Sequence, residues 1–216
     1  MKKRQFIQGL GAGLLVPLII SAFALTISVN AAPDGKPVLA DLKRGGYVIV
    51  LRHGATNRDQ ADTDPLNHSN ISKQRLLSSQ GKIQAQQIGN SFRKLGVSLG
   101  KTYTSKFQRA VETGKLVSGG EVIPIIDLTE GGLVVSPIEN DRRAESLRKM
   151  ATTMPETRKN TLIVTHKPNI IDAFGKDWFE IKEGEASVFK PDQSGKIILI
   201  ARLKATEWAT VMGNQP

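Results

Sequence analysis

The chain has 216 residues, of which 39% are hydrophobic and 23% charged, so it can bury a core and is not broadly disordered. It contains no cysteine, which excludes disulfides, thiol nucleophiles and cysteine-ligated zinc. The formal net charge of +10 favours anionic partners without identifying one. Because only 5% of the residues are aromatic and no block of five consecutive Lys or Arg occurs, we expect no nucleic-acid partner.

The first 31 residues have the layout of an export signal. Basic residues at positions 2–4 precede an uncharged stretch, whose apolar part runs over residues 10–27. Small residues at positions 29–31 then offer a cleavage site ahead of Ala32. A stretch this long also suits an uncleaved membrane anchor. We therefore expect an exported protein, periplasmic or extracytoplasmic, that touches a membrane only if this segment is retained.

Residues 32–46 are expected to form a linker, and residues 47–216 a single domain. The domain opens with a short, β-branched apolar run over residues 47–51, which predicts a buried strand. The polar residues 55–78 predict a long loop that shapes a binding site. Apolar residues repeating at steps of three and four then predict a helix over residues 79–95.

Strands and helices alternate through the rest of the domain. Strands are predicted over residues 101–105, 122–128 and 161–165, helices over residues 107–117 and 142–154, and two late strands over residues 186–190 and 196–202. This alternation predicts one α/β domain with a largely parallel central sheet and helices on both faces.

Chemically matched side chains follow the ends of four predicted strands. Arg52 and His53 follow the first strand, Arg109 lies soon after the second, Glu130 after the third and His166 after the fourth. In parallel sheets, ligands bind beyond the carboxyl ends of the strands. We therefore expect these side chains to gather at one edge of the sheet.

Residues of these types suit the cleavage of a phosphate ester. Arginine binds phosphate oxygens in pairs and keeps its charge throughout. A neutral histidine can attack phosphorus, and neighbouring arginines would disfavour the protonated form of His53. Glu130 could then supply the proton that the leaving alcohol needs.

Three stretches around these residues form a set with a known order. They are Leu51-Arg52-His53-Gly54, Tyr103-Thr104-Ser105 with Arg109-Ala110 and Glu112-Thr113, and Val164-Thr165-His166 with Asn169. Together they resemble the histidine phosphatase superfamily, which has the phosphoglycerate mutase-like fold. The resemblance extends over residues 47–202, nearly the whole predicted domain.

The resemblance implies that His53 is the phosphorylated nucleophile, and that the phosphate is bound by Arg52, Arg109 and His166. Glu130 aligns with the family's proton donor, and Asp59 and Glu185 are further candidates for that role.

The resemblance also implies a type of enzyme. The domain has little room for the insertions with which mutases enclose their substrate, so the expected activity is that of a phosphatase. It would be a metal-independent histidine acid-type phosphatase, a phosphoric monoester hydrolase with a phosphohistidine intermediate. Residues 71–76 resemble an exported subgroup, and one relative there acts on a lipopolysaccharide core phosphate. The expected substrate is a small phosphorylated molecule, either a sugar phosphate or such a core phosphate.

One alternative is a catalytically inactive phosphate- or phosphosugar-binding module of the same fold, which would need the basic residues but no proton donor. We expect no metal and no cofactor, because Arg52 and Lys167 beside the two histidines would repel a cation. His68 is expected to be a solvated loop residue, and Glu112 to pair with a nearby base.

Overall fold

The computed structural model describes residues 27–29 and 36–208 of the chain. The strands are β1 (Ile27–Val29), β2 (Val48–Arg52), β3 (Leu99–Thr104), β4 (Ile123–Pro124), β5 (Asn160–Thr165), β6 (Ala186–Pro191) and β7 (Ile197–Leu203). The α-helices are α1 (Lys36–Asp41), α2 (Ser79–Leu95), α3 (Gln108–Ser118), α4 (Pro137–Thr152) and α5 (Lys167–Phe174). Short 3-10 helices cover Leu42–Arg44, Ile71–Lys73, Ile126–Leu128 and Lys176–Trp178.

The described strands form one sheet in the order β1-β7-β6-β2-β5-β3-β4. The pairs β1–β7, β2–β5, β5–β3 and β3–β4 are parallel, whereas β6 is antiparallel to both β2 and β7. The predicted α/β domain with a largely parallel sheet is therefore confirmed.

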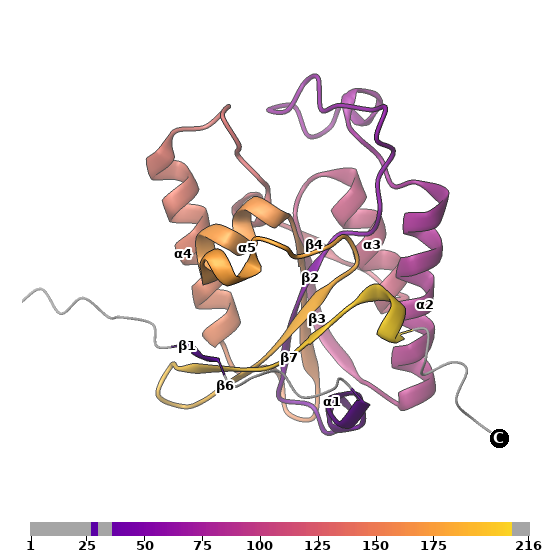
Figure 1. The fold of residues 1–216 in the computed structure, drawn as a ribbon, viewed down its shortest axis with the longest axis vertical. Helices are drawn as coiled ribbons and strands as arrows, with labels where there is room; N and C mark the ends of the chain where they lie inside the picture. The colour runs from indigo at the N-terminus through magenta and orange to yellow at the C-terminus, as the bar shows by residue number, and fades with distance from the viewer. Residues whose placement is uncertain (1–26, 30–35, 209–216) are drawn as a thin grey trace, which may run out of the picture.

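Helices cover both faces of the sheet, with α2 and α3 on one side and α4 and α5 on the other (Figure 1). Alternating residues of β2 serve the two faces, since successive side chains of a strand point in opposite directions. Ile49 and Leu51 pack in the core beneath α1, α2 and α3. Val48 and Val50 pack in the core beneath α4 and α5. The strand is buried on both faces, which explains its unbroken apolar sequence.

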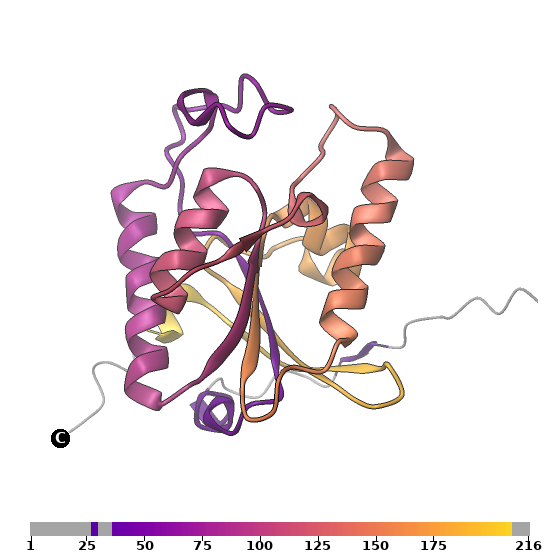
Figure 2. The ribbon, with the colours of Figure 1, turned by 180° about the vertical axis from the view of Figure 1, so that it is seen from behind.

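The parallel strands β2, β5 and β3 bring their carboxyl ends to one edge of the sheet. Arg52 pairs with Thr165, and Thr104 pairs with Val164, so the residues that follow these strands emerge close together. We call this the catalytic edge, after the catalytic site that the sequence predicts there. Figure 2 shows the same arrangement from behind, with the loop 55–78 and the segment 129–136 rising beyond this edge on opposite sides.

The prediction of a third strand over residues 122–128 is mostly wrong. Only Ile123–Pro124 pair with β3, and Ile126–Leu128 form a 3-10 turn. The Ile125 N–H still donates to the Thr104 carbonyl over 2.8 Å, and the chain then leaves the sheet for the 3-10 turn. The turn then carries Leu128 into the core, where it is fully buried.

Two helices differ from their prediction. The helix predicted over residues 142–154 begins earlier, at Pro137, because the Ser136 hydroxyl accepts a hydrogen bond from the Glu139 N–H and caps the first turn. Helix α5 was not predicted at all. It has only eight residues, and its buried Ile170, Ala173 and Phe174 give a short pattern that a sequence alone does not separate from a loop.

Part of the predicted linker belongs to the domain. Helix α1 and the 3-10 turn after it bury Val38, Leu39 and Leu42 in the core. Of the predicted export signal, only β1 falls within the described residues, where it pairs with the start of β7. The cleavage site ahead of Ala32 lies outside the described residues and stays a prediction. Over residues 27–29 and 36–208, no helix is both long and apolar enough to cross a bilayer.

Candidate active site

His53 lies directly after β2 and is 2% exposed. Its backbone N–H donates to the Thr165 carbonyl over 3.1 Å, which fixes it to the end of β5. Its ring Nδ1 lies 2.8 Å from the Gly54 carbonyl oxygen. A carbonyl only accepts, so this contact assigns the proton of the neutral ring to Nδ1. The lone pair on Nε2 is therefore free to act as a nucleophile.

The pKa of His53 is held well below its ordinary value of 6.5. Burial is the largest cause, followed by the nearby His166 and Arg109. We expected a neutral ring because of the arginines, but the loss of solvent around the imidazole contributes more. His53 is therefore in the nucleophilic, uncharged form at neutral pH.

His166, the N-cap residue of α5, is fully buried beside His53, and the two ring centroids are 5.1 Å apart. Its Nε2 forms a 2.7 Å hydrogen bond with the hydroxyl of Ser105, which follows β3. Burial and the charges of Arg109, Arg75 and Arg52 lower its pKa well below the ordinary value. Three guanidinium groups therefore lie within electrostatic reach of this one imidazole.

Arg109 is completely buried in the first turn of α3. Its Nη1 donates to Asp62 over 3.0 Å, and its Nη2 donates to Glu130 in a very short ion pair. Its guanidinium also lies over the Phe107 ring, 4.3 Å from the centroid. A positive charge at a helix start is unfavourable. The two carboxylates compensate for it here, in the position where a bound anion could also do so.

Glu130 joins Arg109 to His166. The carboxylate oxygen that pairs with Arg109 lies 3.6 Å from Nδ1 of His166. Its side chain is 22% exposed, so it is reachable from solvent while held at the site. The predicted site residues Arg52, His53, Arg109, Glu130 and His166 are thus brought to the catalytic edge.

Arg52 is the last residue of β2 and precedes His53. Its Nη1 donates to the Ile181 carbonyl over 2.7 Å, and its Nη2 lies 3.7 Å from Glu183. Glu183 also accepts a hydrogen bond from Thr56, at the start of the loop 55–78. The segment before β6 therefore orients this arginine.

Arg75 is a site residue that sequence reasoning missed. It lies near the end of the loop 55–78, its carbonyl accepts from Arg109, and its backbone N–H donates to Asp62 over 2.9 Å. Asp62 thereby ties the loop to the buried Arg109. The only signal in the sequence was an arginine in the stretch 71–76, just before α2, and nothing in the pattern assigned it to the site.

Unpaired donors gather at the site. Four buried nitrogens here have no hydrogen-bond partner within the described part of the chain, namely Nε of Arg52, Arg75 and Arg109, and Nδ1 of His166. Buried polar atoms are nearly always paired, and an unpaired donor is costly. The three guanidinium groups among them are cationic and suit an anion with several oxygens, such as a phosphoryl group.

The other acids that sequence reasoning considered lie in different surroundings. Glu185 is buried and binds Arg202 through its carboxylate, so it is occupied elsewhere. Asp59 is exposed on the loop. Glu112 pairs with Lys82 over 2.9 Å, as expected. His68 is not simply solvated, because its ring packs against Phe107, with centroids 5.3 Å apart.

Gly54 permits a close backbone contact. We expected it to admit a phosphate, but a Cβ atom built on it would lie 2.7 Å from the Gly81 carbonyl oxygen. A Cβ built on Gly81 would in turn lie 2.0 Å from the Ala55 carbonyl oxygen. The two glycines thus let the start of α2 pack directly against the strand end that carries His53. The Thr113 hydroxyl accepts from the Gly54 N–H and holds the same turn from the other side.

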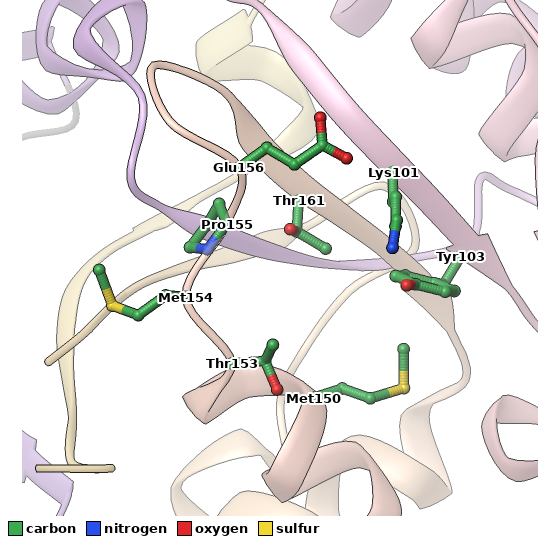
Figure 3. A pocket seen from close by; sticks show the side chains of 8 residues that line it. All are labelled: Lys101, Tyr103, Met150, Thr153, Met154, Pro155, Glu156 and Thr161. Atoms are coloured by element: carbon green, nitrogen blue, oxygen red, sulfur yellow. The ribbon is translucent and has the colours of Figure 1, made fainter. Parts of the chain in front are cut away.

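A pocket of about 130 Å³ lies away from this site, near the amino ends of β3 and β5 (Figure 3). Lys101, Tyr103, Met150 and Thr161 line it, and it contains none of the predicted site residues. Within residues 27–29 and 36–208, no group of three or more His, Asp or Glu side chains is arranged to hold a metal ion.

Comparisons with known proteins agree with this fold. The family model of the histidine phosphatase superfamily (branch 1) matches residues 48–132. The structure of the protein histidine phosphatase SixA complexed with tungstate is similar, with a TM-score of 0.52 and 18% identity, covering 74% of this chain and 97% of that chain. A phosphoserine phosphatase from Entamoeba histolytica in complex with 3-phosphoglyceric acid is also similar, with a TM-score of 0.51 and 15% identity. The match covers 75% of this chain and 98% of that chain. At such identities these structures show a shared fold. No curated protein sequence matches the chain.

Proposed function

Because a family model of the histidine phosphatase superfamily matches residues 48–132, we propose that the chain belongs to this superfamily and hydrolyses phosphate monoesters through a phosphohistidine formed on His53. The observation that carries this proposal is the set of unpaired cationic donors beside a buried, neutral imidazole whose Nε2 is free. Phosphoryl transfer needs mainly positioning and charge stabilisation around the phosphorus, and this site supplies both.

In the first step, Nε2 of His53 attacks phosphorus, and the P–N bond forms as the bond to the leaving oxygen breaks. The guanidinium groups of Arg52, Arg75 and Arg109 and the ring of His166 hold the other oxygens and stabilise their charge. Glu130, in its protonated form, gives its proton to the leaving alkoxide.

In the second step, water attacks the phosphohistidine from the side that the alcohol has left. The Glu130 carboxylate accepts the proton of this water, the P–N bond breaks, and inorganic phosphate is released. His53 returns to its neutral state and Glu130 to its protonated form. Each step moves one proton and one phosphoryl group, and needs neither metal nor cofactor.

The Ser105 hydroxyl supports this chemistry by positioning His166. It can accept from Nε2 of the imidazole or donate to it, so it tolerates either neutral tautomer. The other ring nitrogen faces Glu130 and the arginines. His166 can therefore donate from Nδ1 to a phosphate oxygen when substrate is bound.

The test is hydrolysis of an aryl phosphate by wild type and by His53→Ala, with and without chelator. We expect loss of turnover in the variant, chelator-insensitive turnover in the wild type, and trapping of a phosphoenzyme after acid quench of wild type only. Wild-type turnover by His53→Ala would exclude the nucleophile. A folded wild type that binds tungstate but turns over no ester would favour the inactive binding module instead.

Export of the chain is a separate part of the proposal, supported by the basic, apolar and small-residue order of residues 1–31. Sequencing the amino terminus of the protein recovered from outside the cytoplasm tests it. We expect a new terminus at Ala32, and Met1 would mean that the segment is retained.

A further inference from the structure

The catalytic edge carries the four most exposed large apolar side chains within the described part of the chain. They are Leu133 at 104% exposure, Ile138 at 81%, Leu66 at 65% and Phe179 at 60%. Val134 and Ile71 beside them are 49% and 45% exposed. We call these six residues the apolar rim.

Each part of the rim is close in sequence to a residue of the site. Leu66 and Ile71 belong to the loop 55–78, which Asp62 ties to Arg109. Leu133 and Val134 lie just beyond Glu130, after two glycines, and Ile138 is in the first turn of α4. Phe179 lies two residues before Ile181, whose carbonyl accepts from Arg52. The loop and the segment 129–136 rise on opposite sides of the catalytic edge (Figures 1 and 2).

Exposed apolar side chains gathered in one region mark a surface that binds a partner. The rim residues come from three separate segments, which are the loop 55–78, residues 133–138 and the segment before β6. A folded protein partner would need a matching depression for each segment. A lipid bilayer accepts separate apolar side chains at any spacing, because its interfacial region is soft.

The charges near the rim fit an anionic surface. Arg58, Lys73, Lys106 and Lys167 lie in the loop 55–78 or directly after β3 and β5, and none of them has an ion pair within the described residues. Asp59 and Asp64 lie in the same loop and reduce this excess of positive charge without cancelling it.

Two acids next to rim residues are already paired, whereas Asp141 on α4 has no ion pair within the described residues. Glu139 binds Arg142 and Arg143, and Glu180 binds Lys182. The ammonium of Lys167 lies 5.1 Å above the Phe179 ring, an aromatic and cationic pair suited to the headgroup layer.

We propose that the apolar rim seats on an anionic lipid bilayer, so that the catalytic edge takes its phosphate ester from the membrane surface. The docking is inferred from the rim residues alone, while the choice of substrate rests on the proposed function.

Docking is tested with the full chain, whose lack of cysteine allows single labelling sites. Leu133→Cys carries an environment-sensitive dye, and Ile198→Cys, 41% exposed in β7 at the far edge of the sheet, is the matched control. Vesicles of phosphatidylcholine with phosphatidylglycerol should shift the emission of the dye to the blue at position 133 and leave it unchanged at position 198. An unchanged spectrum at both positions, or equal shifts at both, would overturn the docking.

The substrate class is tested with phosphatidic acid in vesicles against a soluble aryl phosphate. The double variant Leu133→Ser with Ile138→Ser should lose about tenfold or more of its vesicle turnover and keep its soluble turnover. Met154→Ser with Ile198→Ser, similarly exposed but at the opposite end of the sheet, should keep both activities. Equal vesicle turnover in the rim variant and the wild type would overturn the substrate class. If the wild type hydrolysed neither ester, the proposed function would be wrong. The dye shift would still show whether the rim docks on the membrane.

Discussion

One carboxylate oxygen of Glu130 lies 3.6 Å from Nδ1 of His166 and is paired at the same time with Arg109. Asp62 binds the same arginine from the other side, over 3.0 Å. The two acids thus share one partner, but only Glu130 also lies beside the imidazole. Substituting each acid in turn therefore distinguishes a proton donor from a residue that only orients Arg109.

Glu130→Gln should slow the hydrolysis of an alkyl phosphate by about 10²-fold or more, because its leaving group needs a proton. The effect on an aryl phosphate with an acidic leaving group should be much smaller. Asp62→Asn is the matched control, and should slow both esters by a similar factor. Steady-state rates for the two esters check this. An equal loss on both esters in Glu130→Gln would contradict the role of Glu130 as acid.

Arg75 is expected to bind the phosphate directly. Arg75→Gln should raise KM and weaken inhibition by tungstate by about tenfold or more, since a charge-assisted hydrogen bond is lost. Lys73→Gln, an exposed cation two residues earlier, is the control for simple loss of charge. Inhibition curves at constant ionic strength provide the measurement. Equal weakening in both variants would show that Arg75 contributes only long-range attraction.

Much of this site could be predicted because its residues sit next to strands. Val48–Arg52 and Asn160–Thr165 are apolar, short and parallel, so the positions of His53 and His166 followed from the order of elements. Arg109 could be placed in the same way, from the start of its helix.

Arg75 and Asp62 could not be predicted, because they come from a loop. The conformation of this loop depends on contacts far apart in the sequence, such as Asp62 with Arg109, across 47 residues, and Gln74 with the Gln108 N–H, across 34. No local pattern encodes such contacts. The exposure of Leu133 and Phe179 was also invisible, since apolar residues near a sheet are usually read as core.

The low pKa of His53 predicts how activity depends on pH. Attack needs the neutral ring, and the pKa lies well below 6.5, so kcat/KM for an aryl phosphate, whose leaving group needs little help from Glu130, should stay level from about pH 7.5 to about pH 6 before it falls. The three histidines of the chain allow a direct check by imidazole NMR. His53 and His166 should stay neutral through pH 6.5. Titration of His53 near its ordinary pKa would contradict this account.

The same two histidines should make folding less stable in acid. In the unfolded chain they take up protons near pH 6.5, whereas the folded pKa of each is lower. The unfolded state therefore binds more protons below pH 6.5, and the free energy of unfolding falls as the pH decreases toward the folded pKa. Urea midpoints at about pH 7.5 and about pH 5.5 measure this. Replacing both histidines by Asn should reduce the difference between the midpoints.

The close contact of Gly81 with Ala55 predicts that Gly81→Ala destabilises the protein, whereas helix propensity alone predicts that it stabilises it. An alanine in a helix is normally more stabilising than glycine. At Gly81 the new methyl group would lie 2.0 Å from the Ala55 carbonyl oxygen, so α2 would have to move away from the turn that carries His53. Gly81→Ala should therefore lower the free energy of unfolding by about 1–3 kcal/mol and reduce turnover as well. Gly120→Ala is the control, because nothing lies within 4 Å of a Cβ atom there. Thermal unfolding of both variants gives the comparison, and a Gly81→Ala protein as stable as wild type would show that the close approach does not constrain the site.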